Sequence, residues 1–160
     1  MAELQFRRAH AHEAAALSAL ALASKSHWGY SDTQIAAWRD ELIVTPADIS
    51  AYHAHVGMAG ADTIGFFLLR PGSPNWALEH FWMAPQHTGR GLGRAMLLHA
   101  ACIAAQEGAA GLSIDADPNA EAFYLHCGAA RIGLIAAPIE GAPERTRPQL
   151  LLGCPAHSAR

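Results

Sequence analysis

Residues 81–96 read FWMAPQHTGRGLGRAM, and this stretch decides the fold. An apolar segment ends at Pro85, three alternate glycines follow at positions 89, 91 and 93, and helical periodicity begins after them. A glycine lets the backbone approach an anion closely, and the free N–H groups at the start of a helix favour a phosphate. The stretch therefore predicts a strand, a loop suited to a pyrophosphate, and a helix.

Composition and charge favour one globular domain that spans residues 1–160. The chain has 160 residues, of which 51% are hydrophobic, which is enough for one core and too little for two domains. A formal net charge of -3 and a charged fraction of 16% argue against a surface that binds nucleic acid. No apolar run approaches the roughly 18 residues of a membrane span, and residues 1–8 lack the pattern of an export signal. We therefore expect a soluble, cytoplasmic protein with no membrane or nucleic-acid partner.

Cysteine and histidine spacing predicts neither a disulfide framework nor a metal site. Cys102, Cys127 and Cys154 are odd in number and widely spaced, as is typical of free thiols in a reducing compartment. Two His-x-His pairs, at residues 10–12 and 53–55, could each point two imidazoles the same way along a strand. No third ligand follows either pair at metal spacing, so we expect no metal.

The rest of the chain alternates between strand and helix patterns. Period-two or apolar runs predict strands at 4–7, 52–56, 63–69, 76–83, 112–115, 131–135 and 149–152. Helical periodicity predicts a helix at 12–24, a second capped by Ser31 and Gln34, a third from the glycine loop to Gly108, and a fourth from Asp117-Pro118 to Gly128. Pro46 and Asp48 are expected to end the hairpin of the first two helices, and the strands between 52 and 83 to form an antiparallel meander.

A glycine-rich loop after a strand also occurs in dinucleotide-binding proteins, in the first turn of a βαβ unit. That fingerprint has two residues between its second and third glycines, and here there is one, Leu92. An antiparallel hairpin also precedes the loop, in place of an N-terminal parallel strand. The spacing therefore fits the dinucleotide pattern poorly, although Asp115 lies at about the distance of its acidic residue.

Two segments carry a resemblance to a known family. Gln86-x-x-Gly89-x-Gly91 resembles the acyl-CoA pyrophosphate loop of the GNAT N-acetyltransferase superfamily. Residues 117–129, DPNAEAFYLHCGA, resemble the superfamily segment in which an Asn opens a helix and a Phe-Tyr or Leu-Tyr pair follows. Asn119 and Tyr124 occupy the matching positions. Two positions depart from the pattern, because Ala129 stands where Phe is usual and Thr88 where many members have Arg.

The resemblance implies a fold and a set of acetyl-CoA contacts. The fold is α/β (α+β), a mixed and mostly antiparallel sheet of about seven strands flanked by helices, splayed to open an acyl-CoA cleft. The backbone at Trp82 and Met83 would hydrogen-bond the pantetheine arm like an added strand. Asn119 would contact the same arm, and Tyr124 would protonate the leaving thiolate. The pyrophosphate loop would comprise Gln86, Thr88, Gly89, Arg90, Gly91, Leu92, Gly93 and Arg94.

The sequence leaves alternatives open for the residues that would bind and deprotonate the acceptor amine. A base is needed because an ammonium is not a nucleophile, and Glu79 on the strand before the loop is the first candidate. His80 and a chain of water molecules are the alternatives. The segment between the first two helices would form one wall of the acceptor pocket, with Trp28 and Tyr30 suited to a cationic or apolar amine, and His80 nearby.

We therefore expect an enzyme that moves an acetyl group from acetyl-CoA to a primary amine by direct attack in a ternary complex. The acceptor would be a small-molecule or peptide amine, and a homodimer is possible. Two other classes stay open: a non-catalytic CoA-binding or regulatory domain, and a nucleotide-binding protein of another fold.

Overall fold

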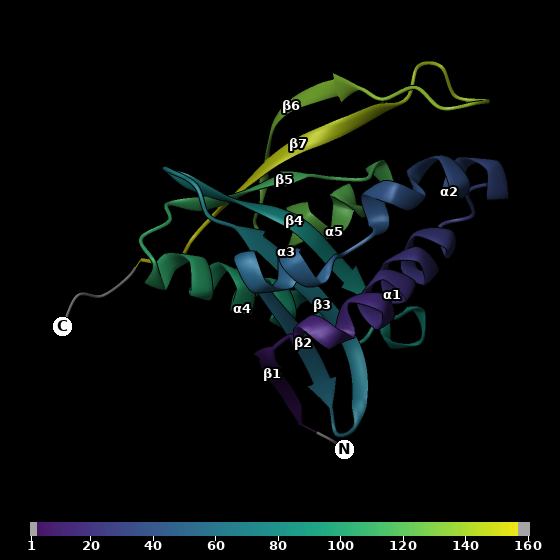
Figure 1. Cartoon of the computed structure of the whole chain (residues 1–160). Coiled ribbons are helices and arrows are strands. Elements are labelled where there is room, and N and C mark those ends of the chain that lie inside the picture. Colours follow the sequence, from purple (N-terminus) through teal and green to yellow (C-terminus); the bar gives the residue numbers. More distant parts are fainter. Residues whose placement is uncertain (1–2, 157–160) are drawn as a thin grey trace. The chain divides into compact units, whose positions relative to one another are not determined.

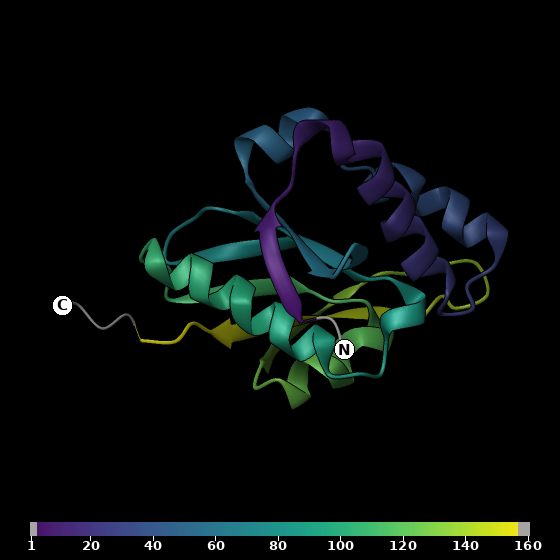
Figure 2. The same cartoon turned by 90° about the horizontal axis from the view of Figure 1, so that it is seen from below.

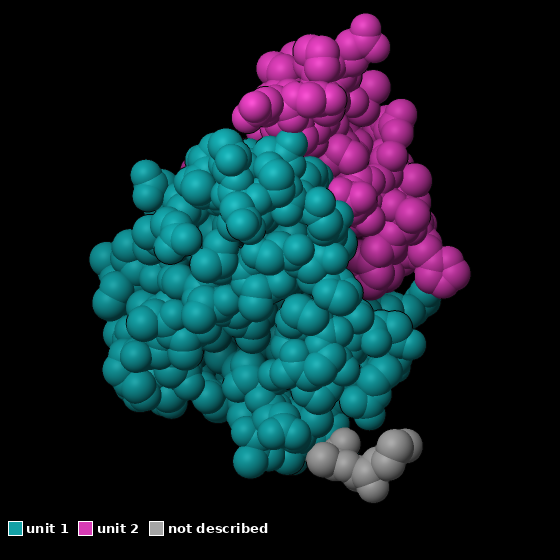
Figure 3. All heavy atoms as spheres, turned by 90° about the vertical axis from the view of Figure 1, so that its right-hand side faces the viewer, with its two compact units in different colours: residues 1–69, 80–97 teal, residues 70–79, 98–160 magenta. Residues whose placement is uncertain are grey.

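The structure, a computed structural model, describes residues 3–156. These residues form two compact units (Figure 3). The first unit contains residues 3–69 and 80–97, and the second contains residues 70–79 and 98–156. A single domain over residues 1–160 stays a prediction, and the ends of that range, residues 1–2 and 157–160, lie outside the described residues.

Within residues 3–156 the strands form a seven-stranded sheet of order β1-β2-β3-β4-β5-β7-β6. The pairs β1·β2, β2·β3, β5·β7 and β6·β7 are antiparallel, and β4·β5 is parallel. The sheet is therefore mixed and mostly antiparallel, which confirms the predicted fold class. The strand bounds are Leu4–Arg8 (β1), His53–Ala59 (β2), Asp62–Arg70 (β3), Asn75–Met83 (β4), Gly111–Asp115 (β5), Ala130–Ala136 (β6) and Thr146–Gly153 (β7).

The helices agree with the sequence patterns except at Pro46. Ser31 Oγ accepts from the Gln34 N–H and Gln34 Oε1 from the Ser31 N–H, which confirms the predicted capping box. Pro46 was expected to end the helical hairpin, and that prediction was wrong, because Pro46 begins another helix that Thr45 caps. The bounds are Ala14–Ser26 (α1), Asp32–Trp38 (α2), Pro46–Ala51 (α3), Leu92–Gln106 (α4) and Glu121–His126 (α5), with short 3-10 turns at Ala11–Glu13, Arg39–Leu42, Pro85–His87 and Pro118–Ala120. None of the helices within residues 3–156 has the length and apolar character needed to cross a bilayer.

In the first unit, α1 and α3 pack on one face of β2 and β3 (Figures 1 and 2). Leu17 and Ala21 of α1 form a buried cluster with Val56 of β2 and Phe66 and Leu68 of β3. Successive residues of a strand face opposite sides of the sheet, so Gly65 faces away from the cluster that contains Phe66 and Leu68.

On that opposite face β3 approaches the end of β4 very closely. A Cβ built on Gly65 would lie 2.4 Å from the Trp82 carbonyl oxygen and within 3.2 Å of the Met83 and Met96 side chains. The Ala84 N–H also donates to the Ile64 carbonyl at 2.8 Å. The absence of a side chain at position 65 therefore allows the end of β4 to lie this close to β3.

In the second unit, β5 and β7 carry the buried apolar pairs Leu112–Leu152 and Ile114–Leu150. The parallel pairing of β4 with β5 joins Asn75–Ala77 to Gly111–Ser113. The predicted splay would separate β4 from β5 beyond these pairs, from Leu78 onward. It stays a prediction.

Candidate active site

The glycine loop has the backbone conformation of an anion-binding nest. Gly89 and Gly91 have φ values of +78° and +74°, and Arg90 between them does not have a positive φ. Alternation of this kind turns successive N–H groups toward one side, where they can surround an anion. A Cβ at either glycine would meet no atom within 4 Å, so the left-handed backbone, and not lack of space, requires glycine here.

The polar residues within and next to this nest in the sequence are exposed to solvent. Gln86, Thr88, Arg90 and Arg94 are exposed, and α4 begins directly after Gly91, at Leu92. The Thr88 hydroxyl donates to the Pro85 carbonyl at 2.9 Å, which tightens the turn that leads into the loop. The loop therefore offers N–H groups, two guanidinium groups and the positive end of a helix dipole to a ligand phosphate. Gly93 lies in the first turn of α4.

Three of the predicted residues meet through aromatic contacts in the first unit. The ring centroids of Trp28 and Trp82 are 6.2 Å apart, and the Trp82 indole N–H donates to His80 Nδ1 at 3.1 Å. The imidazole of His80 also lies 6.0 Å from the ring of Phe66. The structure thus brings Trp28, predicted from the helical segment, next to His80 and Trp82 of β4.

The bond to Trp82 fixes the tautomer of His80. An indole N–H can only donate, so His80 Nδ1 must be unprotonated to accept it. The neutral imidazole then carries its proton on Nε2. Nδ1 is therefore occupied, and only a rearrangement of the Trp82 contact would free it to take a proton from a substrate.

A second aromatic group encloses Lys25, which is 9% exposed. Its ammonium lies 4.2 Å from the ring centroid of Trp38, 5.2 Å from that of Tyr30 and 5.8 Å from that of Trp28. Tyr30 and Trp38 are also in edge-to-face contact, with centroids 4.7 Å apart. Trp28 and Tyr30 were expected to make cation–π contacts with a substrate amine. In the structure, both rings already make such contacts with the ammonium group of Lys25.

Glu79 lies beside His80 in β4, and adjacent strand residues point to opposite faces. Its carboxylate is exposed and pairs with the Arg70 guanidinium at 2.7 Å. Glu79 is therefore directed away from the face that holds His80 and Phe66.

Tyr124 and Asn119 lie in the second unit, around the start of α5. Tyr124 is 6% exposed. Burial raises the pKa of its phenol well above the ordinary value, and nearby negative charge on Cys127 and Asp117 raises this pKa further. Asn119 is exposed, with its backbone N–H donating to Asp117 Oδ1 at 2.8 Å and its side-chain Nδ2 donating to the same oxygen at 3.0 Å.

The sequence did not predict the partners of two charged groups, Lys25 and Arg145. The burial of Lys25 among the aromatic rings had a partial signal, because all three rings lie within 13 positions of it in the sequence. Arg145, which pairs with Asp117, had none, since 28 residues separate the two. Among residues 3–156, no group of three or more His, Cys, Asp or Glu side chains is arranged to hold a metal ion.

Known proteins share both the sequence pattern and the fold. The sequence matches the Acetyltransferase (GNAT) family over residues 15–129, which is more than half of the chain. The strand order, the nest before α4 and this match define the class of the protein, which is an acetyltransferase enzyme. The chain belongs to the Acetyltransferase (GNAT) family. No curated protein matched the sequence.

Solved structures agree with this assignment. A GCN5-related N-acetyltransferase from Rhodopseudomonas palustris has a TM-score of 0.77 and 21% identity, covering 96% of this chain and 97% of its own. The PaiA N-acetyltransferase from Thermoplasma acidophilum, solved in complex with coenzyme A, has a TM-score of 0.73 and 17% identity, with coverage of 94% and 99%. YncA from Salmonella typhimurium, solved with acetyl-CoA, has a TM-score of 0.69 and 15% identity, with coverage of 99% and 98%. At these identities the likeness shows the shared fold.

Proposed function

We propose that the chain transfers an acetyl group from acetyl-CoA to a primary amine by direct attack within a ternary complex. The observation that carries this proposal is the nest at Gly89 and Gly91, which stands at the start of α4 and follows β4 through the 3-10 turn Pro85–His87. The family match and the structures that contain coenzyme A or acetyl-CoA support acetyl-CoA as the donor. The acceptor is a small-molecule or peptide amine.

We assign the donor contacts as the sequence predicted them. The backbone at Trp82 and Met83 pairs with the pantetheine arm, and Asn119 accepts a hydrogen bond from one of its amides. Tyr124 lies at the sulfur. The pyrophosphate is held by the loop residues Gln86, Thr88, Gly89, Arg90, Gly91, Leu92, Gly93 and Arg94.

The reaction needs one proton removed and one proton supplied. The amine nitrogen forms a bond to the thioester carbon, the carbonyl oxygen becomes an oxyanion, and the C–S bond then breaks to release a thiolate. Tyr124 supplies the proton that the thiolate takes up. Its raised pKa keeps the phenol protonated at neutral pH, so it is available as a donor throughout the working range.

We propose that water carries the amine proton away and that Glu79 receives it at the surface. The Glu79 carboxylate is exposed and pairs with the Arg70 guanidinium at 2.7 Å. His80 is a poorer acceptor, because its Nδ1 already takes the Trp82 indole N–H.

Changing Glu79 to Gln is therefore expected to lower kcat/KM only about tenfold, since bulk water can replace a surface carboxylate, whereas a base in direct contact is worth about 10²–10⁴-fold. The measurement is steady-state acetylation of an amine substrate, with Arg70→Gln as the control that breaks the same ion pair but keeps the carboxylate. An unchanged rate would assign proton removal to water or His80, and a loss above 100-fold would show direct contact with the substrate.

The alternative function is a CoA-binding or regulatory domain without catalysis. Two measurements separate it from the enzyme: isothermal titration with acetyl-CoA, and thiol release in the presence of a panel of primary amines. Binding with amine-dependent thiol release supports the transferase, and binding without release supports the regulatory domain. Absence of binding at millimolar acetyl-CoA contradicts both.

Thermal stabilisation by CoA but not by NAD or ATP would exclude a nucleotide-binding protein.

We also propose that the protein works in the cytoplasm as a homodimer. Cys102, Cys127 and Cys154 take part in no disulfide, which suits a reducing compartment. The terminal strand β6 exposes Ile132 and Leu134 at 64% and 53%. Apolar side chains on an edge strand favour pairing with another strand, and a second copy of β6 would supply one. Light scattering after gel filtration is expected to give twice the 17.0 kDa chain mass, and a monomer at micromolar concentration would contradict it.

A further inference from the structure

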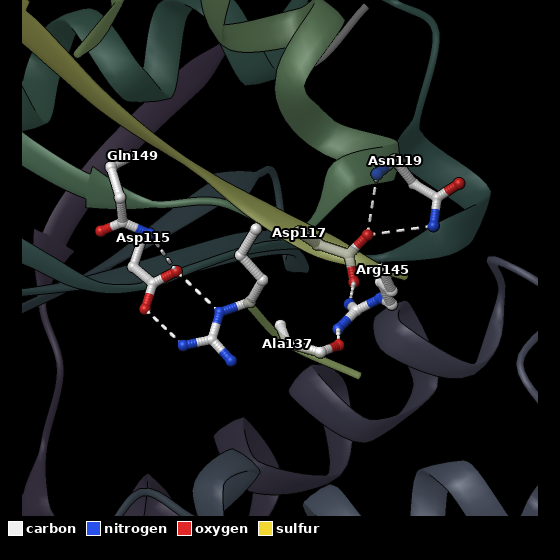
Figure 4. A network of polar contacts seen from close by, with 7 residues as sticks. Asp115, Asp117, Asn119, Ala137, Arg145 and Gln149 are labelled. Atoms are coloured by element: carbon white, nitrogen blue, oxygen red, sulfur yellow. Dashed lines mark hydrogen bonds and ion pairs between the residues drawn. The ribbon is translucent and has the colours of Figure 1, made fainter. Parts of the chain in front are cut away.

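An ion pair buried in the second unit connects the loop between β6 and β7 to the turn before α5 (Figure 4). Arg145 Nη2 donates to Asp117 Oδ2 at 3.4 Å, and Arg145 Nη1 donates to the Ala137 carbonyl at 3.1 Å. The two charged side chains are 9% and 5% exposed. Ala137 and Arg145 also pair through the backbone, because the Ala137 N–H donates to the Arg145 carbonyl at 2.9 Å. The guanidinium is thus held at a fixed position in the loop.

Asp117 uses its other oxygen to fix Asn119. Asp117 Oδ1 accepts both the backbone N–H and the side-chain Nδ2 of Asn119. Because Nδ2 is committed to Asp117, the carboxamide oxygen of Asn119 is turned away from the carboxylate, as Figure 4 shows. The oxygen that would accept from an amide of the pantetheine arm is therefore oriented before any ligand arrives.

The same carboxylate lies close enough to Tyr124 to act on its titration. The negative charge on Asp117 is among the causes that raise the pKa of the Tyr124 phenol. A buried carboxylate is stable only when a partner compensates its charge, and Arg145 is such a partner. Asp117 thus links Arg145 to Asn119 and Tyr124, the two residues of this unit that we assign to acetyl-CoA.

We propose that Arg145 is a positioning residue for the donor side of the site: through Asp117 it fixes the carboxamide of Asn119 toward acetyl-CoA and compensates the carboxylate beside Tyr124. This inference rests on the proposed function for its kinetic effect. Its structural part, the orientation of Asn119, holds whether or not the protein is an acetyltransferase.

Arg147 provides a matched control in β7, two residues after Arg145. Its guanidinium makes a bidentate pair with Asp115 at 2.8 and 2.9 Å, and that carboxylate also accepts from Gln149 Nε2 at 2.9 Å. This pair is exposed, with side-chain exposures of 35% and 48%, and its hydrogen bonds join Arg147, Asp115 and Gln149. Arg147→Met therefore removes an arginine–aspartate pair from the same hairpin without removing the compensation of Asp117.

The first experiment measures the orientation of Asn119 by NMR of its side-chain amide group. Arg145→Met is expected to shift the Asn119 Nδ2 proton resonances toward those of a solvated amide, while Arg147→Met leaves them in place. Unchanged resonances in Arg145→Met, or equal shifts in both variants, would overturn the proposal. This measurement needs no ligand, so it separates failure of the inference from failure of the proposed function.

The second experiment measures kinetics with acetyl-CoA. Arg145→Met is expected to raise KM for acetyl-CoA and lower kcat, together about tenfold in kcat/KM, whereas Arg147→Met changes it less than about twofold. Asp117→Asn keeps an acceptor oxygen for Asn119 and removes the charge that needs Arg145. The double variant Asp117→Asn/Arg145→Met is therefore expected to recover most of the loss of Arg145→Met. Losses that multiply in the double variant would show that Arg145 does not act through Asp117.

Two further arms cover the case in which Arg145→Met unfolds. Arg145→Lys keeps the positive charge but lacks the forked donors that reach both Asp117 and Ala137, so it is expected to fold and to recover part of kcat/KM. The double variant leaves no charge uncompensated and is expected to fold as well. An acetyl-CoA KM equal to wild type in Arg145→Lys, with unshifted Asn119 resonances in that variant, would overturn the inference.

Discussion

Replacing Tyr124 by Phe is expected to lower kcat by about 10²–10⁴-fold, the usual contribution of a general acid. The phenol of Tyr124 is buried, so the variant loses one hydroxyl group and keeps the ring that packs against Phe123, with centroids 5.2 Å apart. Steady-state thiol release measures kcat, and titration with CoA measures the affinity, which is expected to stay nearly unchanged. An unchanged kcat would remove Tyr124 from the proposed mechanism.

The pH dependence of this variant gives an independent check. An ordinary thiol has a pKa of about 8.5, below that of the Tyr124 phenol, so full proton transfer to the thiolate becomes harder as the phenol pKa rises. The phenol therefore donates a hydrogen bond to the sulfur while the C–S bond breaks, and its proton moves only as negative charge develops on the sulfur. Because its folded pKa is raised, wild-type activity should show no loss from Tyr124 ionisation up to about pH 10, and a fall below that pH must come from another group.

Replacing Gly65 by Ala is expected to destabilise the protein by about 3 kcal/mol or more. The new Cβ would lie 2.4 Å from the Trp82 carbonyl oxygen, which is backbone and cannot turn aside as a side chain can. For a chain of this size, about 3 kcal/mol corresponds to a decrease of roughly 10 °C in Tm, which calorimetry can measure. The new Cβ would also displace the backbone at Trp82, which we assign to the pantetheine arm. The folded fraction of the variant should therefore have a raised KM for acetyl-CoA.

Gly57→Ala in β2 is the matched control. Its Cβ would approach Ile64 Cγ1 at 3.2 Å and Phe6 Cε1 at 3.4 Å, and both atoms belong to side chains that can adjust. The expected decrease in Tm is therefore much smaller than for Gly65→Ala. Equal decreases in the two variants would mean that the contact with the Trp82 carbonyl has no special cost.

The parts of this fold that depend on local chemistry were predictable from the sequence. Apolar and period-two runs located the seven strands, and the Ser31–Gln34 capping box located the start of α2. The glycine loop before α4 was likewise predicted from its spacing, but the structure was needed to show that Gly89 and Gly91 are its left-handed residues. Pro46 was misread because proline suits both a turn and the first position of a helix, although Thr45 and Asp48 form a readable capping box.

The parts that depend on distant pairs were not predictable. Nothing near Arg145 indicates that its guanidinium is paired with Asp117, since the pairing of β5 with β7 brings the two residues together. The contact of Trp82 with His80 is local, but its consequence for the tautomer required the geometry. The carboxylate of Glu79 could be placed on a strand face, but its pairing with Arg70 across nine residues could not.

The cluster of tryptophans provides an optical readout for the unidentified acceptor. Of the four tryptophans of the chain, Trp28, Trp38 and Trp82 lie around Lys25 and His80 in the first unit, and Trp76 lies in the second. Indole emission responds to a change in local polarity and to nearby quenching groups, so an amine that settles against Trp28 or Trp82 should change the intrinsic fluorescence of the protein. A library of amines can therefore be screened for binding without label or coupled enzyme. The signal is expected to weaken in Trp28→Phe and to persist in Trp76→Phe.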